Sequence, residues 1–208
     1  MNAGQGLFIT LEGGEGAGKS TAAAGLASLL AEGGGQVVQT REPGGTPGAE
    51  AIRALLLDAR VSLTPMAQTL LHFAARAEHV EAVIRPALAR GAIVICDRYT
   101  DSTMAYQAYG QGVDKTAIAD LSRLINLTPD LTFILEVPIS VAFNRLKMRG
   151  LGPDRYERMG PDFMARVAQG FRAIAAAEPA RCVMVDAAQP AAAVLASLRQ
   201  TIAERLGR

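Results

Sequence analysis

The chain has 208 residues, half of them hydrophobic, and a formal net charge of +1. This length suits one α/β domain, and the near-neutral charge gives no global field that would point to nucleic acid or to a membrane surface. Neither a secretory apolar segment nor a run of about 18 apolar residues stands out, so we expect a soluble, cytoplasmic protein.

The first predicted elements are a strand, a glycine-rich loop and a helix. Residues 7–11 are apolar and predict a buried strand, and the Ala/Leu-rich residues 20–30 predict a helix. Residues 13–20 between them match the phosphate-loop pattern G-x-x-x-x-G-K followed by Ser or Thr, without a mismatch. Glycines let a backbone turn tightly and aim its N–H groups at phosphate oxygens, beside the positive end of the next helix. The predicted ATP-binding residues are Gly13, Gly14, Glu15, Gly16, Ala17, Gly18, Lys19, Ser20 and Thr21, and the alternative is a glycine-rich turn that binds nothing.

Three side chains of this loop have distinct expected roles. Lys19 should reach the β- and γ-phosphates of ATP, and the Ser20 hydroxyl should bind Mg²⁺. Glu15 is unusual, because a carboxylate inside a phosphate cradle repels the ligand unless it meets a metal or a donor. We expect Glu15 to serve a substrate hydroxyl or the Mg²⁺ shell, and the alternative is a loop residue that points outward.

Strands and helices alternate along the rest of the chain. Thr64 followed by Pro65 predicts a helix start, and that helix should run to about Ala89, before Gly91. Further strands are predicted at residues 36–40, 92–96, 131–137 and 182–186, and further helices at 49–57, 102–107, 114–126, 140–148, 161–177 and 190–206. This alternation predicts an α/β P-loop NTPase fold, in which a doubly wound parallel sheet of about five strands carries helices on both faces of a single domain.

The strand at residues 92–96 ends at Asp97, which resembles a Walker B element. Its carboxylate would lie beside the phosphate loop and hold Mg²⁺ directly or through water, although strand-end aspartates are also often caps or turn residues. Arg98 next to it is a natural clamp for a second phosphate. Cys96 and Cys182 both lie in apolar runs, where buried thiols are expected rather than a disulfide or a metal site.

Two further segments carry candidate binding groups. His72, Phe73 and Arg76 are spaced so that they can border one face of the long helix, where an aromatic ring and an arginine can hold a base. The alternative is a core Phe with a surface Arg. The Gly/Pro-broken residues 149–160 carry Arg149 and Arg155 and predict either a lid that closes on the transferring phosphoryl group or a solvated loop.

Several segments together resemble bacterial thymidylate kinase (dTMP kinase). They are Thr40–Thr46, Asp97–Tyr99, Asp101–Gln107, Pro129–Leu131 and Asp154–Glu157. The resemblance covers nearly the whole chain, from Leu7 to the last helix. It implies a nucleoside monophosphate kinase fold, a homodimer, and phosphorylation of dTMP to dTDP with ATP as co-substrate and Mg²⁺ as cofactor.

The resemblance also implies roles for single residues. Glu15 matches the acidic position beside the 3′-hydroxyl of dTMP, Arg53 and Arg98 match positions that hold the dTMP phosphate, and Arg76 matches the thymine-binding arginine. The other matching acceptor-site positions are Glu42, Pro43, Thr103, Tyr106 and Gln107. Tyr106 would disfavour a 2′-hydroxyl.

Family members with glycine after the acidic loop residue, as Gly16 here, supply catalytic arginines from the lid, and Arg149 and Arg155 match that pattern. The chain departs from the family at one position. An aromatic residue usually lies four residues before the thymine-binding arginine, whereas this chain has His72 there and Phe73 one residue later. Either side chain could stack on the base.

The acceptor is a phosphate monoester that is already anionic, so no general base is required. Catalysis should consist of positioning and charge neutralisation by Lys19, the loop amides, Mg²⁺ and the lid arginines. The alternatives are a kinase for another nucleoside monophosphate and a nucleotide-dependent switch. The chain lacks the N-K-x-D motif with which GTPase switches read their base.

Overall fold

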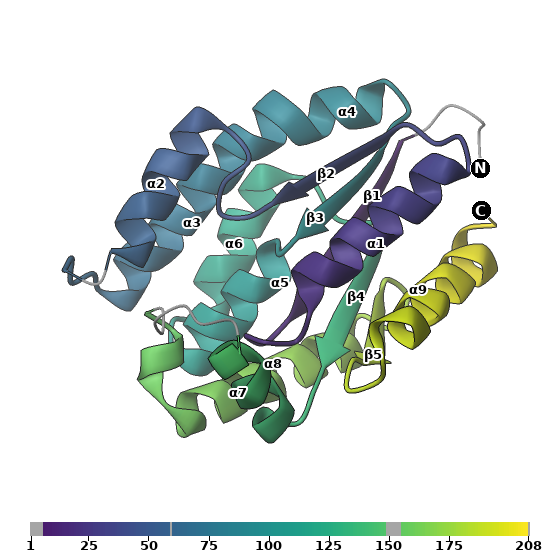
Figure 1. Cartoon of the computed structure of the whole chain (residues 1–208). Helices are drawn as coiled ribbons and strands as arrows, with labels where there is room; N and C mark the ends of the chain where they lie inside the picture. Colours follow the sequence, from purple (N-terminus) through teal and green to yellow (C-terminus); the bar gives the residue numbers. More distant parts are fainter. Residues whose placement is uncertain (1–5, 59, 149–154, 208) are drawn as a thin grey trace.

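The structure is a computed structural model that describes residues 6–58, 60–148 and 155–207. One five-stranded sheet has the order β2-β3-β1-β4-β5, and all four strand pairs are parallel. The strands are β1 (Leu7–Gly13), β2 (Val37–Arg41), β3 (Ile93–Asp97), β4 (Leu131–Glu136) and β5 (Cys182–Asp186). The predicted parallel α/β sheet of about five strands is confirmed (Figure 1).

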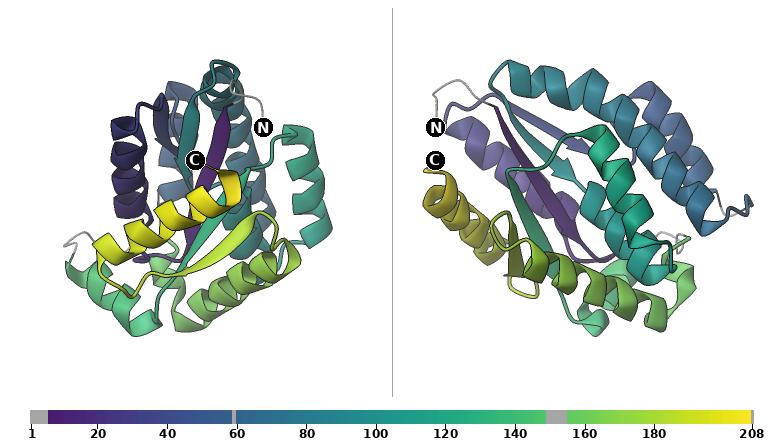
Figure 2. Two further views of the ribbon diagram at one scale, coloured as in Figure 1. Left: turned by 90° about the vertical axis from the view of Figure 1, so that its right-hand side faces the viewer. Right: turned by 180° about the vertical axis from the view of Figure 1, so that it is seen from behind.

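Helices lie against both faces of this sheet. They are α1 (Lys19–Glu32), α2 (Pro47–Leu57), α3 (Pro65–His79), α4 (Arg85–Ala89), α5 (Thr100–Thr103), α6 (Lys115–Ile125), α7 (Ile139–Met148), α8 (Pro161–Ala177) and α9 (Ala191–Leu206), together with the π-helical segments η1 (Val80–Ile84) and η2 (Met104–Gly110) and the 3₁₀ turn η3 (Glu157–Met159). Helix α1 lies in front of the sheet in Figure 1, and the right-hand view of Figure 2 shows α6 and α8 on the opposite side.

The alternation of side chains along β1 explains the two faces. Leu7, Ile9 and Leu11 point to one face, where they share a core cluster with buried residues of α1 and α9. Phe8 points to the other face and packs with buried residues of η1 and α4. A strand that is buried on both faces has to be apolar at successive positions, as this one is.

The long helix starting at Pro65 is not a regular α-helix throughout. Thr64 caps it, because its side chain accepts a hydrogen bond from Ala67 N, and the helical conformation continues to Ala89 as predicted. The π-helical segment η1 interrupts it immediately before α4. Pro86 is the physical reason: it has no N–H to donate, and its ring would clash with the carbonyl four residues earlier in an α-helix.

The carboxyl ends of β1, β2 and β3 lie next to one another, because the three strands are parallel and adjacent. The loops after these strands therefore meet at one edge of the sheet, beside the point where the strand order reverses direction at β1. Open α/β sheets bind their ligands in this position. Among the described residues no helix is both long and apolar enough to cross a membrane.

Candidate active site

A cavity of about 850 Å³ opens at this edge of the sheet. Its lining begins at the phosphate loop with residues 15–22 and continues through residues 41–43 after β2 and 97–99 after β3. Side chains from α2, α3 and η2 complete one end, and residues of α7 and α9 complete the other. The loop predicted to hold phosphate thus lies between the two ends of this cavity.

The backbone of the phosphate loop favours glycine at its key positions. Gly13, Gly16 and Gly18 have φ angles of 132°, 72° and 90°, in the region that L-residues rarely occupy. A Cβ atom on Gly13 would lie 2.3 Å from the carbonyl oxygen of Leu135, and one on Gly16 would lie 2.6 Å from that of Ala142. The loop is therefore tightly packed against β4 and α7, which holds its shape.

Lys19 begins helix α1 and is buried beside the loop. Its Nζ donates to the Gly14 carbonyl oxygen at 2.7 Å. Burial, with the nearby Arg98 cation, lowers the pKa of Lys19 to about 8. A cation held in this way lies where the β- and γ-phosphates are expected, at the positive end of α1.

The two predicted magnesium ligands are brought together. Ser20 Oγ donates to Asp97 Oδ2 at 2.5 Å, although the two residues come from α1 and from the end of β3. A hydroxyl and a carboxylate oxygen at the side of a phosphate loop fit Mg²⁺, which takes oxygen ligands and keeps several waters.

Arg98 follows Asp97 and has a φ of 73°, although it is not glycine. Its guanidinium donates to the Gly13 carbonyl oxygen at 3.1 Å, to Ser102 Oγ at 3.1 Å and to Glu15 Oε1 at 2.5 Å. Tyr106 also donates to Glu15 Oε1, at 3.1 Å. Glu15 therefore points into the cavity, and the alternative of an outward-pointing loop residue is wrong.

Glu12 on β1 supports the Arg98 arrangement through Ser102 and is not among the site residues that the sequence predicts. It is fully buried, and its carboxylate accepts Tyr99 N at 2.7 Å and Ser102 Oγ at 2.5 Å. Burial and the nearby Asp101 raise the pKa of Glu12 to about 7. The sequence does contain an indication of this role: Glu12 directly follows the predicted apolar strand, and a charged side chain buried there needs a hydrogen-bond partner.

Arg76 is buried, so the alternative of a surface arginine is wrong. Its Nε donates to Glu42 Oε2 at 2.7 Å, and its Nη2 donates to Tyr99 O at 3.0 Å and to Thr103 Oγ1 at 3.1 Å. The guanidinium carbon lies 4.7 Å from the Phe73 ring centroid and 5.1 Å from that of Tyr99. Within the described part of the chain, Nη1 has no hydrogen-bond partner.

His72 and Phe73 lie in different places. His72 lines the cavity, and its Nε2 lies 3.0 Å from the Tyr156 hydroxyl. Burial and the Arg76 and Arg98 cations lower the pKa of His72 to about 3, so the ring is neutral. Phe73 instead packs in a core cluster with residues of η2 and α6 and is not among the residues that line the cavity.

Two successive side chains of the π-helical segment η2 point into the cavity. Tyr106 and Gln107 both line it, and Thr103 lies one turn before them. Gln107 Nε2 donates to the Tyr156 hydroxyl at 3.2 Å. Tyr156, which follows Arg155 in the chain, thus contacts both His72 and Gln107, a role that the sequence does not predict.

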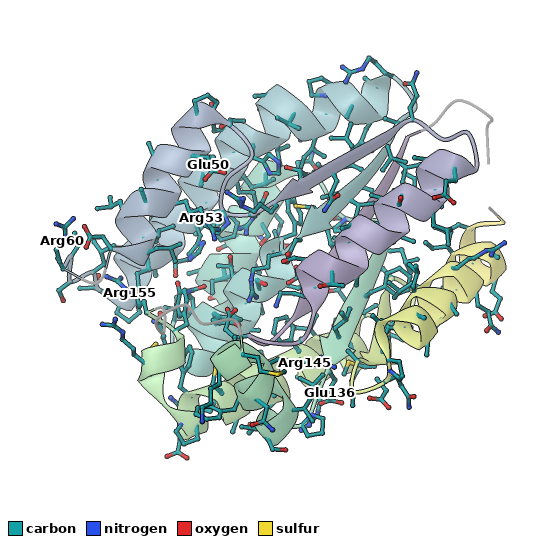
Figure 3. All side chains as sticks on the ribbon, viewed as in Figure 1. Glu50, Arg53, Arg60, Glu136, Arg145 and Arg155 are labelled. Carbon is teal, nitrogen blue, oxygen red and sulfur yellow. The ribbon has the colours of Figure 1, made fainter. Side chains whose placement is uncertain are left out.

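The arginine that lies beside the phosphate loop is not the one that the sequence predicts. Arg155 Nη2 donates to the carbonyl oxygens of Asp58 (3.0 Å) and Val61, beyond the end of α2, and the structure does not bring it to the phosphate loop. Arg145 on α7, which we had not singled out, does reach it, since Nη1 donates to Gly16 O at 3.4 Å and Nη2 to Ala187 O at 2.9 Å. Figure 3 shows the two side chains well apart. Arg149 lies outside the described residues.

Arg53 on α2 lies at the far end of the cavity and donates to the Pro43 carbonyl oxygen at 2.9 Å. Pro43 follows Glu42 through a cis peptide bond. The loop after β2 is thereby tied both to α2 through Arg53 and to α3 through Arg76. These contacts place two arginine side chains opposite the phosphate loop.

The site combines a phosphate loop, a hydroxyl–carboxylate pair and a cationic pocket that faces them across one cavity. Together with the parallel sheet, these features define a phosphate-loop kinase for a small phosphorylated acceptor.

Comparison with known proteins gives the family. A family model described as thymidylate kinase matches residues 11–198. A thymidylate kinase of Gluconobacter oxydans is 52% identical, with 98% of this chain and 97% of the relative covered, and one of Chromohalobacter salexigens is 51% identical with 97% of each covered. The crystal structure of thymidylate kinase from Ehrlichia chaffeensis superposes with a TM-score of 0.80 at 36% identity, covering 95% of this chain and 99% of that one. The chain belongs to the thymidylate kinase family.

Proposed function

We infer that the protein transfers the γ-phosphoryl group of ATP to the phosphate of dTMP, giving ADP and dTDP. The observation that carries this function is a cavity in which a complete phosphate loop faces a buried arginine, Arg76, whose Nη1 has no hydrogen-bond partner among the described residues. Relatives at about 50% identity over nearly the full chain are named thymidylate kinase.

On the donor side, we assign the ATP phosphates to the backbone N–H groups of residues 13–21 and to Lys19. The N-terminal end of α1 adds its positive dipole to this field. Ser20 and Asp97 would hold Mg²⁺, which supplies charge neutralisation at the β- and γ-phosphate oxygens. Arg145 lies beside Gly16 and Ala187, at the end of the cavity lined by α9, and we assign this end to the nucleoside of ATP.

On the acceptor side, Arg98 and Arg53 would hold the dTMP phosphate in line with the γ-phosphoryl group. Glu15 would accept the 3′-hydroxyl, and Tyr106, whose hydroxyl bonds Glu15, would leave no room for a 2′-hydroxyl. The acceptor phosphate is already anionic and needs no general base, so the residues contribute orientation and charge.

At the base, we assign Nη1 of Arg76, which no other described residue bonds, to a carbonyl oxygen of thymine. His72 lines the cavity, whereas Phe73 packs in the core behind Arg76, so we favour His72 for the contact with the face of the base. Gln107 would add an amide at the edge of the base. A buried donor without a partner favours ligands that supply an acceptor.

Four points stay predictions: the homodimer, the single-domain organisation, the cytoplasmic location, and the catalytic role of the lid arginines Arg149 and Arg155. The homodimer is supported by exposed apolar side chains on α3 and α6, which pack side by side: Met66, Leu70 and Leu124. Exposed apolar side chains on neighbouring helices favour a protein interface.

An acceptor-specificity assay tests the function. Turnover with ATP and Mg²⁺ is measured with dTMP, dUMP, AMP and GMP, and dTMP should give the highest kcat/KM. Phosphate release is measured without any acceptor and should be nearly absent. A preference for another monophosphate, or rapid hydrolysis without an acceptor, would contradict the assignment.

A further inference from the structure

Beside Arg76 lies a line of hydrogen-bonded polar side chains from β2, the loop after it and α3, of which Glu42, Arg76 and His79 are buried and Thr40 is half-buried. Thr40 on β2 has its Oγ1 2.6 Å from Nε2 of His79, the last residue of α3. Nδ1 of His79 lies 3.0 Å from Glu42 Oε1, and Glu42 Oε2 accepts Arg76 Nε at 2.7 Å. His79 is fully buried and does not line the cavity, so it has no direct contact with a substrate there.

The chemistry of the partners fixes the direction of these hydrogen bonds. Glu42 pairs with the Arg76 cation and is therefore an acceptor at both oxygens. His79 must then donate from Nδ1 to Oε1, and in a neutral ring Nε2 accepts the Thr40 hydroxyl. The imidazole thus connects the end of β2 to the carboxylate that orients Arg76.

The imidazole has little freedom to move. A Cβ on Gly45 would lie 2.6 Å from His79 Cδ2 and Nε2 and 2.8 Å from Thr40 Oγ1, so the loop after Glu42 packs directly on the ring. Packing on one side and hydrogen bonds at both nitrogens hold the ring in one orientation.

A metal site is the other possible use of these groups. Ligand atoms of Glu42, His79 and Cys96 lie within 4.8 Å of one another. Glu42, however, already pairs with Arg76, and burial raises the pKa of the Cys96 thiol well above its usual value, so that the thiolate a metal needs is disfavoured. The geometry therefore favours a hydrogen-bonded support over a metal centre.

We propose that His79 is a positioning residue for recognition of the acceptor base: it fixes Glu42, and Glu42 fixes the plane of Arg76 so that Nη1 faces the cavity. The proposal rests on the proposed role of Arg76 in binding the base. A shift of a recognition group by about 0.5 Å weakens binding, although every atom that touches the ligand is still present.

Two isosteric variants separate the two nitrogens of His79. The side-chain amide nitrogen of Asn can take the place of Nδ1 and keep the bond to Glu42, whereas that of Gln can take the place of Nε2 and keep only the contact with Thr40. We expect His79→Gln to raise both the KM and the calorimetric Kd for dTMP about tenfold, the scale of one lost hydrogen bond to a charged group. We expect kcat and the KM for ATP to change less than about threefold, and His79→Asn to restore dTMP binding to within about threefold of the wild type.

A double-mutant cycle tests whether His79 acts through Arg76. In an Arg76→Ala background, His79→Gln should weaken dTMP binding by less than about twofold further, because coupled residues are not additive. Thr69→Val on the same helix, where Thr69 is equally buried and bonds Pro65 O, controls for loss of stability and should leave the dTMP Kd unchanged. Thr40→Val should weaken dTMP binding in the same direction as His79→Gln but less, and provides a second variant if a His79 variant does not fold.

The outcomes distinguish the inference from the function it rests on. An unchanged dTMP Kd in His79→Gln, an Asn variant as impaired as the Gln variant, or additivity with Arg76→Ala would overturn the positioning role. An unchanged dTMP Kd in Arg76→Ala alone would instead overturn the assignment of Arg76 to the base.

Discussion

The two ends of the cavity are built in different ways. The phosphate cradle at the donor end is nearly continuous in sequence, since residues 13–21 form the loop and the first turn of α1, and its shape comes from glycine backbone conformations. The acceptor end takes side chains from α2, α3, η2 and the ends of β2 and β3. A local motif can shape a backbone cradle, whereas an assembled pocket needs contacts that hold each side chain in place.

The cationic side chains at the two ends of the cavity also differ in their hydrogen-bond partners. At the donor end Lys19 bonds a backbone carbonyl, whereas at the acceptor end two arginines bond carboxylates: Arg76 has Glu42, and Arg98 has Glu15. An unpaired buried cation is costly, so a pocket that gathers two arginines requires paired carboxylates. Removing groups from each end therefore should give different kinetic signatures.

The largest expected effect concerns the predicted lid arginines. If it is not observed, the contrast between the two ends of the cavity does not extend to the lid. Arg149→Ala or Arg155→Ala, or both, should lower kcat on the order of 10³-fold with little change in the dTMP Kd, because an arginine that meets the moving phosphoryl group acts mainly in the transition state. Steady-state kinetics with calorimetric dTMP binding on both variants checks this. Near-wild-type kcat in both would show that the segment has no catalytic arginine and that Arg155 only holds its own segment against the end of α2.

Lys19→Ala tests the donor end. It should lower kcat by about 10²- to 10³-fold, because Lys19 supplies charge to the transition state rather than packing. Thermal unfolding should show that the fold survives. A variant that keeps more than about a tenth of the wild-type kcat would contradict the role.

Arg76→Ala tests the acceptor end and sharpens the contrast with Lys19. It should raise the KM for dTMP by about 10- to 100-fold while the KM for ATP changes little, because a base contact is made in the ground state as well as in the transition state. Arg123→Ala, at an exposed arginine paired with Asp120, is the control and should match the wild type. Equal changes in both KM values would remove Arg76 from the acceptor site.

The smallest expected effect is a pH dependence of stability from Glu12. Its pKa is raised to about 7 by burial and by Asp101, against the opposing effect of Arg98, Ser102 and Tyr99 N. The folded state therefore binds more protons than the unfolded state between the unfolded pKa of 4.5 and about 7, and stability should fall as pH rises through this window.

Glu12→Gln should flatten that slope in urea unfolding followed from pH 4.5 to 8, because the amide cannot ionise. Glu32→Gln, at an exposed position at the end of α1, is the matched control and should keep the wild-type slope. An identical slope in the wild type and Glu12→Gln would mean that the pKa of Glu12 is the same in the folded and unfolded states, which would contradict the raised pKa.

The sequence by itself determined the features that depend on neighbouring residues. The phosphate loop, the cap at Thr64 and the alternation of strands and helices all follow from local backbone preferences, and the structure confirms them. The segments that carry the family resemblance are also continuous stretches of chain. These features can be predicted from the sequence because they depend on neighbouring residues and not on contacts with distant parts of the chain.

Only the tertiary structure decided the direction and burial of side chains far apart in sequence. Glu12 bonds Ser102 across 90 positions, Tyr156 reaches His72 across 84, and Arg145 reaches Gly16 across 129. The choice of which neighbour, His72 or Phe73, faces the cavity also depends on the partners of α3, because α6 and η2 enclose Phe73. A side chain takes its role from the groups that replace water around it, and those groups are assembled only when the chain folds.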